Sequence, residues 1–480
     1  MATNQPRKLE DFGKLTQAEQ QVLDELDTGE IIRLGDGKVP PEDAGPERQL
    51  RARFLRWLAL GGDDDHRFHE KGLQVAGALI TSDGPAGAET PGLDLEGCEI
   101  ARDLVFFDCR FADKPLLRRT RLQSLFLNDS VLPGLHADGL EAHDDVNLGG
   151  VVVTGEVRLP GARIGGHLTC DGAKITNQGG WALNVDGAKV TGTFFLRKYE
   201  KDDAKIDAKI DGVLNLSGAE LGAINDDPDC WPKKFGDLAL NRCQYGALTG
   251  HGIRAADRIR WLALQDPAKF DQDFWPQPYE QCAKVFREMG HLADARDILI
   301  EKEKLQRAAR RAKLKGPRLW WFGFWDFVLA QTVSYGQKPL SALRWLFLLW
   351  VIGFGVFLLT WQLNAFKPNN AFVLRADEWV NCSQESPSYK TRKGTPTASQ
   401  LRCFLARPQA KGFPEFNAGV YALDVLFPLV EVEQQVHWVP DEDIWPAGVL
   451  AKGLVYFEIV AGWLLSLLAV AGLSGIIKSD

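Results

Sequence analysis

The segment Gly155-Glu-Val-Arg-Leu-Pro-Gly-Ala-Arg-Ile164 decides the fold, because the chain repeats its pattern on both sides. The next copy is Gly166-His-Leu-Thr-Cys-Asp-Gly-Ala-Lys-Ile175, and later copies lie at Trp181–Val190 and Gly212–Leu221. Each copy places apolar residues two apart and turns at Gly-Ala or an equivalent pair, and the closest neighbours recur about every 11 residues. A small turn residue followed by an inward aliphatic side chain is what narrow, stacked coils require. The pattern predicts a parallel β-helix, right- or left-handed, over residues 72–250.

Looser copies of the pattern lie nearer the N-terminus, at Leu93–Ile100 and Leu104–Phe111. The charged segment Lys198–Lys209 interrupts the later copies and is expected to form a surface loop. A β-sandwich would also give short strands at regular spacing, but the recurring Gly-Ala-aliphatic turn favours the β-helix. Apolar residues at helical spacing within 15–26 and 47–60 predict a helical cap before it.

The pattern becomes helical after Gly250. Helices are expected at 253–264, 279–289 and 292–313, and the stretch Tyr279–Arg296 looks like a single tetratricopeptide-type hairpin. One such hairpin cannot bury its own apolar face. We therefore expect it to pack on the end of the β-helix, on a membrane surface or on another copy. The linker ends in a basic cluster expected to face anionic lipid, made of Arg307, Arg310, Arg311, Lys313, Lys315 and Arg318.

Two apolar segments lie near the C-terminus. Leu340–Leu363 carries no charge after Arg344, and Leu454–Ile477 contains Glu458 as its one charged residue. At about 1.5 Å per helical residue, either segment can cross a hydrocarbon core of about 30 Å. The aromatic stretch Leu319–Phe327 before them suits the membrane interface. These features predict an integral membrane protein with two spans; a buried core helix is the alternative for each segment.

Charge and cysteine placement predict the topology. The first residues are polar and lack the apolar core of a signal peptide, and the basic cluster before the first span favours the inside. The loop between the spans then lies outside, where Cys382 and Cys403 are expected to form a disulfide. The predicted segments are a helical cap at 1–71, a β-helix at 72–250, a helical hairpin linker at 251–318, an interfacial segment at 319–338, a first span at 339–364, an extracytoplasmic loop with a short re-entrant or interfacial helix at 365–448, and a second span at 449–480.

Composition argues against a nucleic-acid partner, because the net charge is −8 and no basic patch carries interleaved aromatic residues. The segment Gly250-His-Gly-Ile-Arg-Ala255 matches the G-x-G-x-x-A pattern of dinucleotide sites. Acids about 20 residues on, Asp271 and Asp273, are in range. However, Phe274-Trp-Pro-Gln-Pro278 follows, with no second strand. Gly250, Gly252 and Ala255 are therefore interpreted as the exit from the β-helix, and no cofactor is expected.

Two groups of histidines and acids could ligate a metal. His66 and His69 follow an aspartate run, and His136 and His143 flank further acids. Groups of this kind are usually solvated turns, so no metal site is predicted. The chain also lacks the H-E-x-x-H, G-x-x-x-x-G-K-[ST] and G-x-S-x-G motifs, and no catalytic group is predicted.

The outer loop contains an apolar stretch, Phe416–Val430, that is too short to span a membrane. With the acids Asp424, Glu431 and Glu433 it forms the layout of a simple two-span cation channel, in which carboxylate rings favour cations. An interfacial helix bracing the loop is the alternative and the favoured interpretation. Small residues four apart in the last span permit close helix contacts, and a homo-oligomer is expected.

The order of these segments resembles a bacterial family of two-span membrane proteins with a pentapeptide-repeat or bactofilin-like β-helix. The resemblance includes the short helical start, the hairpin motif Gln277-Pro-Tyr-Glu-Gln281 and the stretch Tyr421–Val430 before the last span. It implies a location in the bacterial inner membrane, and the charge placement and two spans described above place both termini in the cytoplasm. Relatives are sometimes labelled membrane-associated oxidoreductases.

Three functions follow as hypotheses. The leading one is a non-enzymatic membrane protein whose cytoplasmic β-helix acts as a scaffold or sensor for an unidentified cytoplasmic partner. The second is an oligomeric cation channel gated by that domain. The third is an NAD(P)-dependent oxidoreductase, which the motifs do not support.

Overall fold

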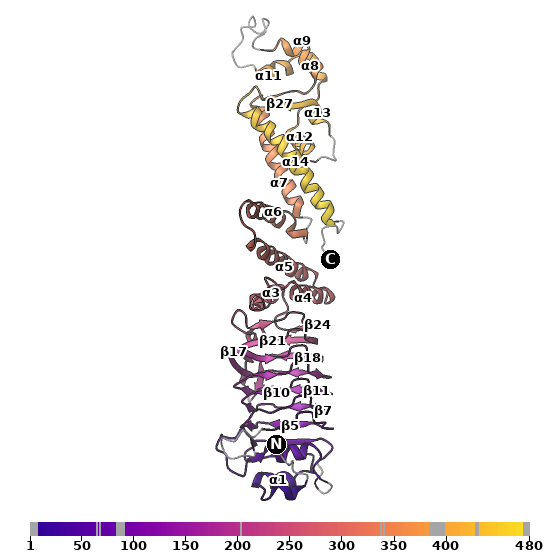
Figure 1. Ribbon diagram of the computed structural model, residues 1–480. Coiled ribbons are helices and arrows are strands. Elements are labelled where there is room, and N and C mark those ends of the chain that lie inside the picture. The colour runs from indigo at the N-terminus through magenta and orange to yellow at the C-terminus, as the bar shows by residue number, and fades with distance from the viewer. Residues whose placement is uncertain are drawn as a thin grey trace. The chain divides into compact units, whose positions relative to one another are not determined.

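The computed structural model describes residues 8–63, 66, 69–82, 92–201, 204–336, 338, 341–383, 399–427 and 432–473. The chain divides into two compact units, Met1–Arg310 and Arg311–Asp480, with the division in the last turn of a long helix. Parallel strands fill most of the first unit, and helices make up most of the second (Figure 1).

The strands of the first unit form two sheets in which every pair is parallel, apart from a short hairpin described below. We call residues 32–250, without that hairpin, the strand stack. The described strands of the first sheet are β1 (Ile32–Arg33), β3 (Leu73–Ala76), β5 (Leu104–Phe107), β7 (Arg121–Leu122), β8 (Leu125–Phe126), β11 (Glu141–Ala142), β12 (Val146–Asn147), β15 (Arg163–Ile164), β16 (Leu168–Thr169), β18 (Lys189–Leu196), β22 (Glu220–Asp226), β24 (Gln244–Tyr245) and β25 (Leu248–Gly250). Those of the second are β2 (Gln49–Arg51), β4 (Leu79–Thr81), β6 (Arg110–Phe111), β9 (Val131–Leu132), β10 (Leu135–His136), β13 (Val152–Val153), β14 (Val157–Arg158), β17 (Lys174–Asn184), β21 (Lys209–Asn215) and β23 (Leu238–Ala239).

Each coil of the stack contains two of the 11-residue copies. Arg121 pairs with Glu141, Glu141 with Arg163, and Arg163 with Lys189, which are 20, 22 and 26 residues apart. The copy 155–164 supplies β14 to one sheet and β15 to the other, so one copy makes half a turn. Two copies that follow each other in sequence therefore form the two halves of one coil. The strands of each copy are hydrogen-bonded to strands of the second copy before it and the second copy after it.

The core of the stack is a column of aliphatic and aromatic side chains that lie in register. Burying a side chain of this size stabilises the fold by about 1.5–3 kcal/mol. One row, at most 1% exposed throughout, consists of Leu125, Val146, Leu168, Phe194, Ile224 and Leu248.

The stack begins inside the predicted cap, because β1 and β2 already pair with β3 and β4. Helices still cover this end, and Phe54 and Leu58 are fully buried there. The Glu19 carboxylate, also fully buried, lies 2.7 Å from Arg51 Nη2 and accepts the Thr16 N–H in a capping box. The covering elements are η1 (Leu9–Phe12), α1 (Gln17–Asp24) and α2 (Ala52–Ala59).

The predicted charged loop contains an antiparallel hairpin, β19 (Tyr199–Lys201) and β20 (Ala204–Ile206). Its side chains contact earlier coils: Lys201 Nζ lies 3.2 Å from Asp108 Oδ1 and 2.9 Å from Asp129 Oδ2. The hairpin therefore lies across the stack.

Helices cover the other end of the stack. The motif Gln277–Gln281 belongs to α4 (Pro276–Glu288), and its two glutamines occupy the free backbone edge of the last coil. The Gln277 side chain accepts the Arg242 N–H at 2.8 Å and donates to the Cys243 carbonyl at 2.9 Å, while Gln281 donates to the Tyr245 carbonyl at 2.7 Å. The elements here are η2 (Pro228–Cys230), α3 (Ala255–Leu262), η3 (Pro267–Phe270), α4 (Pro276–Glu288) and α5 (Leu292–Ala312).

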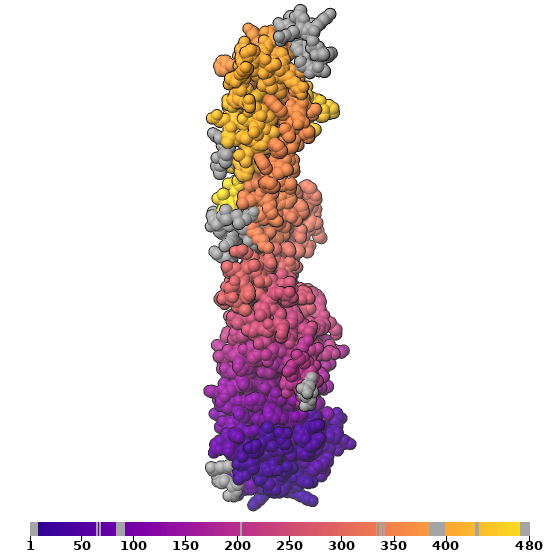
Figure 2. All heavy atoms as spheres, turned by 180° about the vertical axis from the view of Figure 1, so that it is seen from behind, coloured from indigo at the N-terminus to yellow at the C-terminus, as the bar shows by residue number. Residues whose placement is uncertain are grey.

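The second unit contains two helices long and apolar enough to cross a membrane, Ser341–Gln362 (α7) and Ala447–Val470 within α14. The second of these helices begins earlier than its predicted start at Leu454. It can include Lys452 because the amine of that residue pairs with Glu442. Both views show α7 and α14 side by side (Figures 1 and 2). The other described elements are α6 (Pro317–Val333), η4 (Ser334–Gly336), β26 (Phe366–Pro368), α8 (Ala371–Arg375), α9 (Asp377–Val380), α11 (Gln400–Leu405), η5 (Pro408–Gly412), α12 (Ala418–Leu426), α13 (Gln434–His437), β27 (Trp438–Pro440) and α14 (Ala447–Leu473).

Candidate functional site

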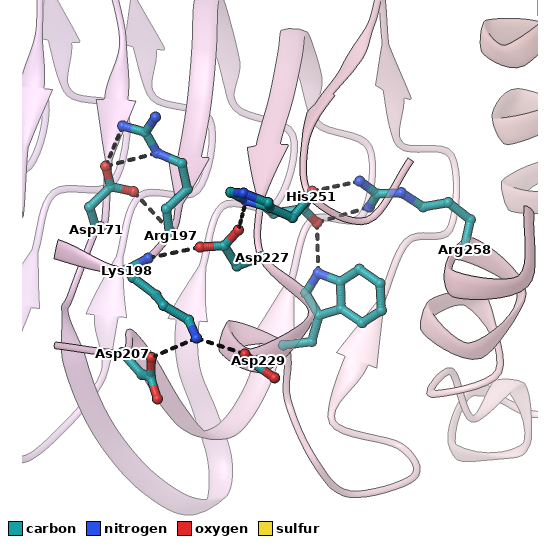
Figure 3. Close-up of polar contacts among 10 residues, drawn as sticks. Asp171, Arg197, Lys198, Asp207, Asp227, Asp229, His251 and Arg258 are labelled. Atoms are coloured by element: carbon teal, nitrogen blue, oxygen red, sulfur yellow. Dashed lines mark hydrogen bonds and ion pairs between the residues drawn. The ribbon is translucent and has the colours of Figure 1, made fainter. Parts of the chain in front are cut away.

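A group of charged residues lies where β18 and β22 end, close to the helical end of the stack (Figure 3). Its buried half is the ion pair between Asp226 and Arg258, joined by two hydrogen bonds of 2.6 and 2.8 Å. The Trp231 indole donates to Asp226 at 2.7 Å, and the Arg258 guanidinium lies over the rings of Trp231 and Trp261. Both side chains of this pair are buried, and the pair joins α3 to the end of β22.

The exposed half of the group is centred on Lys198. Its amine lies 2.7 Å from Asp229 and 3.5 Å from Asp207. The hydrogen bond to Asp229 raises the pKa of Lys198 and lowers the pKa of Asp229, so the pair is ionised at neutral pH. Beside it, His251 Nδ1 lies 2.6 Å from Asp227 Oδ1.

A cavity of about 730 Å³ lies next to this group, between β20, β21 and the segment 229–237. Lys174 and Lys209 line it and are register partners on stacked strands, so two like charges adjoin. Like charges placed side by side are unfavourable, and the aspartates of the same cavity offset them, as Asp211 does for Lys209. The charged lining residues are Lys174, Lys205, Lys209, Lys233, Lys234, Asp207, Asp211, Asp229 and Asp237.

The glycines of the dinucleotide-like segment have packing roles. A side chain at Gly250, whose φ is +95°, would collide with the Asp226 carbonyl, and one at Gly252 would meet Trp231 at 3.0 Å. At the start of α3, the Ala255 N–H donates to the Asp294 carboxylate at 2.9 Å. An internal carboxylate thus occupies the helix terminus where a dinucleotide fold would bind pyrophosphate.

The histidine groups are dispersed over the surface. His66 pairs with Asp63, while His143 pairs with its neighbour Asp144. Burial and the nearby Lys114 lower the pKa of His136. Within the part of the chain that the structure describes, no three histidines, cysteines or acids are arranged to hold a metal ion.

Asp424, one of the three candidate pore acids, has a structural contact. Its carboxylate accepts the Val432 N–H at 3.0 Å and the Gln435 N–H at 2.8 Å, which fixes the turn before α13. Glu433 is exposed at a left-handed φ of 61°, and Glu431 lies outside the described residues.

The predicted cysteine pair is joined: Cys382 and Cys403 form a disulfide between α9 and α11. The two sulfurs lie in the segment that connects α7 to α14. The six free cysteines all precede α7, and five of them are buried.

The predicted basic cluster and the aromatic segment follow each other along α5 and α6. Arg310, Lys315 and Arg318 are exposed, whereas Arg311 lies 3.3 Å from the buried Asp326 on α6. The aromatic side chains of α6 point outward, with Trp320 at 75% exposed.

The sequence did not indicate two functional features. The first is the way Gln277 and Gln281 cover the edge of the last strand. Their spacing of four residues indicates that they share one face of a helix, but not which strand that face covers. The second feature is the packing of α12 against α7 and α14. The Trp350 indole of α7 donates to the Gly419 carbonyl of α12 at 3.0 Å, and Gly462 of α14 lies against the Leu426 carbonyl of α12.

Comparison with known protein families, with curated proteins and with solved structures finds no match. Function is therefore inferred from this chain's own residues.

Proposed function

We propose that this chain is a non-enzymatic integral protein of a bacterial inner membrane, whose cytoplasmic β-helix is a scaffold or sensor for a partner. The observation that carries the proposal is the apolar surface of α7 and α14. Phe347, Leu359 and Leu450 are 60–68% exposed. Soluble monomers rarely leave contiguous apolar surface of this kind in water, whereas a lipid bilayer would cover it.

The state of the cysteines supports an orientation in which the loop between the two helices faces an oxidising compartment. The disulfide lies in that loop, and the free thiols precede α7. Disulfides persist outside the cytoplasm and are rare within it. The exposed basic residues just before α6 agree with this orientation, because such residues favour the inner leaflet.

Two measurements on intact cells and membranes test the anchor and its orientation. Alkaline carbonate should leave the chain in the membrane fraction, and an impermeant maleimide should label Cys382 and Cys403 only after reduction. Cys98, the partly exposed thiol of the strand stack, is the internal control and should stay unlabelled until the cells are opened. Release by carbonate, or labelling of Cys98 in intact cells, would contradict the proposal.

The cavity beside Lys198 is the part of the β-helix that best supports a partner site, because lysines and aspartates both line it and can pair with a charged segment. A photo-crosslinking residue at Lys209 should give a discrete adduct in living cells. The same residue at Glu220, which lies in the other sheet, is the matched control and should give none. Equal adducts at both positions, or none at either, would count against a scaffold that uses this surface.

A cation channel formed by several copies is the second candidate, favoured by the position of α12. This helix is too short to span a membrane, yet Tyr421, Ala422, Val425 and Leu426 are buried as it packs on α7 and α14. Purified protein in vesicles should then conduct monovalent cations, and Glu433→Gln should reduce the flux. A monomer in detergent with no flux in vesicles would remove this candidate.

A further inference from the structure

One acid of the apolar helices is buried and has no hydrogen-bond partner in the part of the chain that the structure describes. Glu458 lies on α14 and is 0% exposed. Its carboxyl group lies directly against Gly353 of α7: an added Cβ at Gly353 would be 2.8 Å from Oε2 and closer still to Oε1. The absence of a side chain at Gly353 therefore creates the space that the carboxyl group occupies.

Neither oxygen of Glu458 has a hydrogen-bond partner within the described part of the chain. On α7 the one charged residue is Arg344, which is exposed and nine residues, or about 13 Å, from Gly353 along the helix. On α14 itself, Lys452 is paired with Glu442.

The other titratable groups on this side come from α12. They are Tyr421, which lies within electrostatic range of Glu458, and Asp424, whose two oxygens already accept backbone N–H groups. Among the described residues of α7, α12 and α14, no cationic side chain therefore faces the carboxyl group.

These contacts decide which ligand the carboxyl group can hold. An ionised carboxylate that is buried without a partner is strongly unfavourable, and inside a membrane such a group is usually functional. A metal cation would need several oxygen ligands, and the described part of the chain holds no group of three or more histidines, cysteines or acids that could bind one. A single proton neutralises the group without any further ligand.

We propose that Glu458 is a proton-binding site in the membrane-embedded part of the protein. The inference rests on the proposed placement of α7 and α14 in lipid. The proton-bound carboxylic acid is the form that packs on Gly353. When the O–H bond breaks and the proton passes to water, the remaining carboxylate must gain water, so the contact between α7 and α14 loosens at Gly353. Proton occupancy and helix packing are thereby linked.

Infrared spectroscopy of the full chain in lipid vesicles tests the protonation state. The wild-type spectrum at neutral pH should contain a carboxylic acid C=O band that is absent from Glu458→Gln and disappears as the pH is raised. Glu442→Gln, which removes an exposed acid of the same segment, is the control and should keep the band. A wild-type spectrum with no band assignable to Glu458 at neutral pH would overturn the proposal.

A second measurement uses only the wild-type protein, so it does not depend on whether the Glu458→Gln variant folds. Dicyclohexylcarbodiimide, which dissolves in lipid and reacts with protonated carboxyl groups, should modify the wild-type peptide that contains Glu458, and modification should slow as the pH rises. Labelling whose rate is independent of pH would contradict proton binding.

Variants at Gly353 test the packing half of the proposal. Gly353→Ala should destabilise the wild-type protein, and the same change in a Glu458→Ala background should be tolerated, because the space is then free. Equal loss in both backgrounds would show that Glu458 does not fill this space.

The outcomes separate this inference from the anchor itself. Release of the chain by carbonate would remove the proposed function. A chain that stays in the membrane with Glu458 ionised at neutral pH would remove only the proton site.

Discussion

Asp226 and Arg258 are the clearest case in which single side chains hold the fold together. Both are at most 2% exposed, and each is the other's charge partner. Removing one member of such a pair leaves an uncompensated buried charge, which costs about 3–5 kcal/mol. We expect Asp226→Ala to lower the free energy of unfolding by this amount, measured by urea denaturation of the first unit.

The matched control is the exposed ion pair between Arg121 and Glu141, which lies on the same stack. Glu141→Ala should cost less than about 1 kcal/mol, because solvent screens exposed pairs. Equal effects of the two substitutions would contradict the role assigned to burial.

The cysteines of the strand stack give a prediction that depends on pH. Burial raises the pKa of Cys109, Cys243 and Cys282 to about 12 and raises that of Cys170 as well. Thiolates, not thiols, are alkylated, so these groups should stay unreactive in the native protein from neutral to mildly alkaline pH.

Iodoacetamide should therefore modify one thiol of the unreduced native protein, the partly exposed Cys98. Peptide mass mapping locates the adduct, and Cys98→Ser should abolish it. Denaturation in urea should make all six thiols reactive. Modification of Cys109 in the native state below about pH 9 would contradict the buried column.

At the scale of the single element, close approach of neighbouring coils requires glycine at particular turns. A Cβ at Gly222 would collide with the carbonyl oxygens of Thr191 and Gly192. Because backbone atoms cannot move aside as side chains do, Gly222→Ala should destabilise the stack by about 3 kcal/mol.

Gly161→Ala serves as the comparison in urea unfolding. Nothing lies within 4 Å of its added Cβ, but its φ is +64°, so only the conformational penalty of about 1 kcal/mol remains. A larger loss at Gly161 than at Gly222 would count against close coil approach as the cause.

The glutamines of α4 give a second prediction for an element. Gln277→Ala with Gln281→Ala leaves the Arg242 N–H and the carbonyls of Cys243 and Tyr245 without their side-chain partners. Each unpaired group costs about 1–3 kcal/mol where water cannot reach it. Amide hydrogen exchange should speed up in β24 and α4 but not in β8, which lies several coils away. Unchanged exchange in β24 would mean that the glutamines do not stabilise this edge.

The sequence predicts elements well where a pattern is local and repeated. The spacing of apolar residues was enough to predict parallel strands in stacked sheets, the helices of the linker and two membrane-length helices. The first coil was missed, because β1 is two residues long and carries no copy of the repeat. The contact between Glu458 and Gly353 could not be predicted, since the two residues are 105 positions apart and meet only when their helices pack.

For the whole molecule, the division of the chain into two units predicts that the first can be separated. A fragment ending at Arg310 keeps the strand stack, both of its covering ends and nearly all of α5. It should be soluble and monomeric, and should unfold in one cooperative transition followed by circular dichroism. The complementary membrane fragment should stay in the carbonate-resistant fraction. An insoluble first fragment would mean that its exposed surface needs the second unit.

The covered ends of the strand stack also decide how copies of the chain can associate. An open edge of paired strands is a template onto which another chain can add. Here helices close the first coil, and the side-chain amides of Gln277 and Gln281 occupy the last one. Growth of a fibre by head-to-tail addition is thereby blocked at both termini of the stack. Copies of the chain would then associate through the sides of the stack or through the second unit, where a contact with closed symmetry gives an assembly of fixed size.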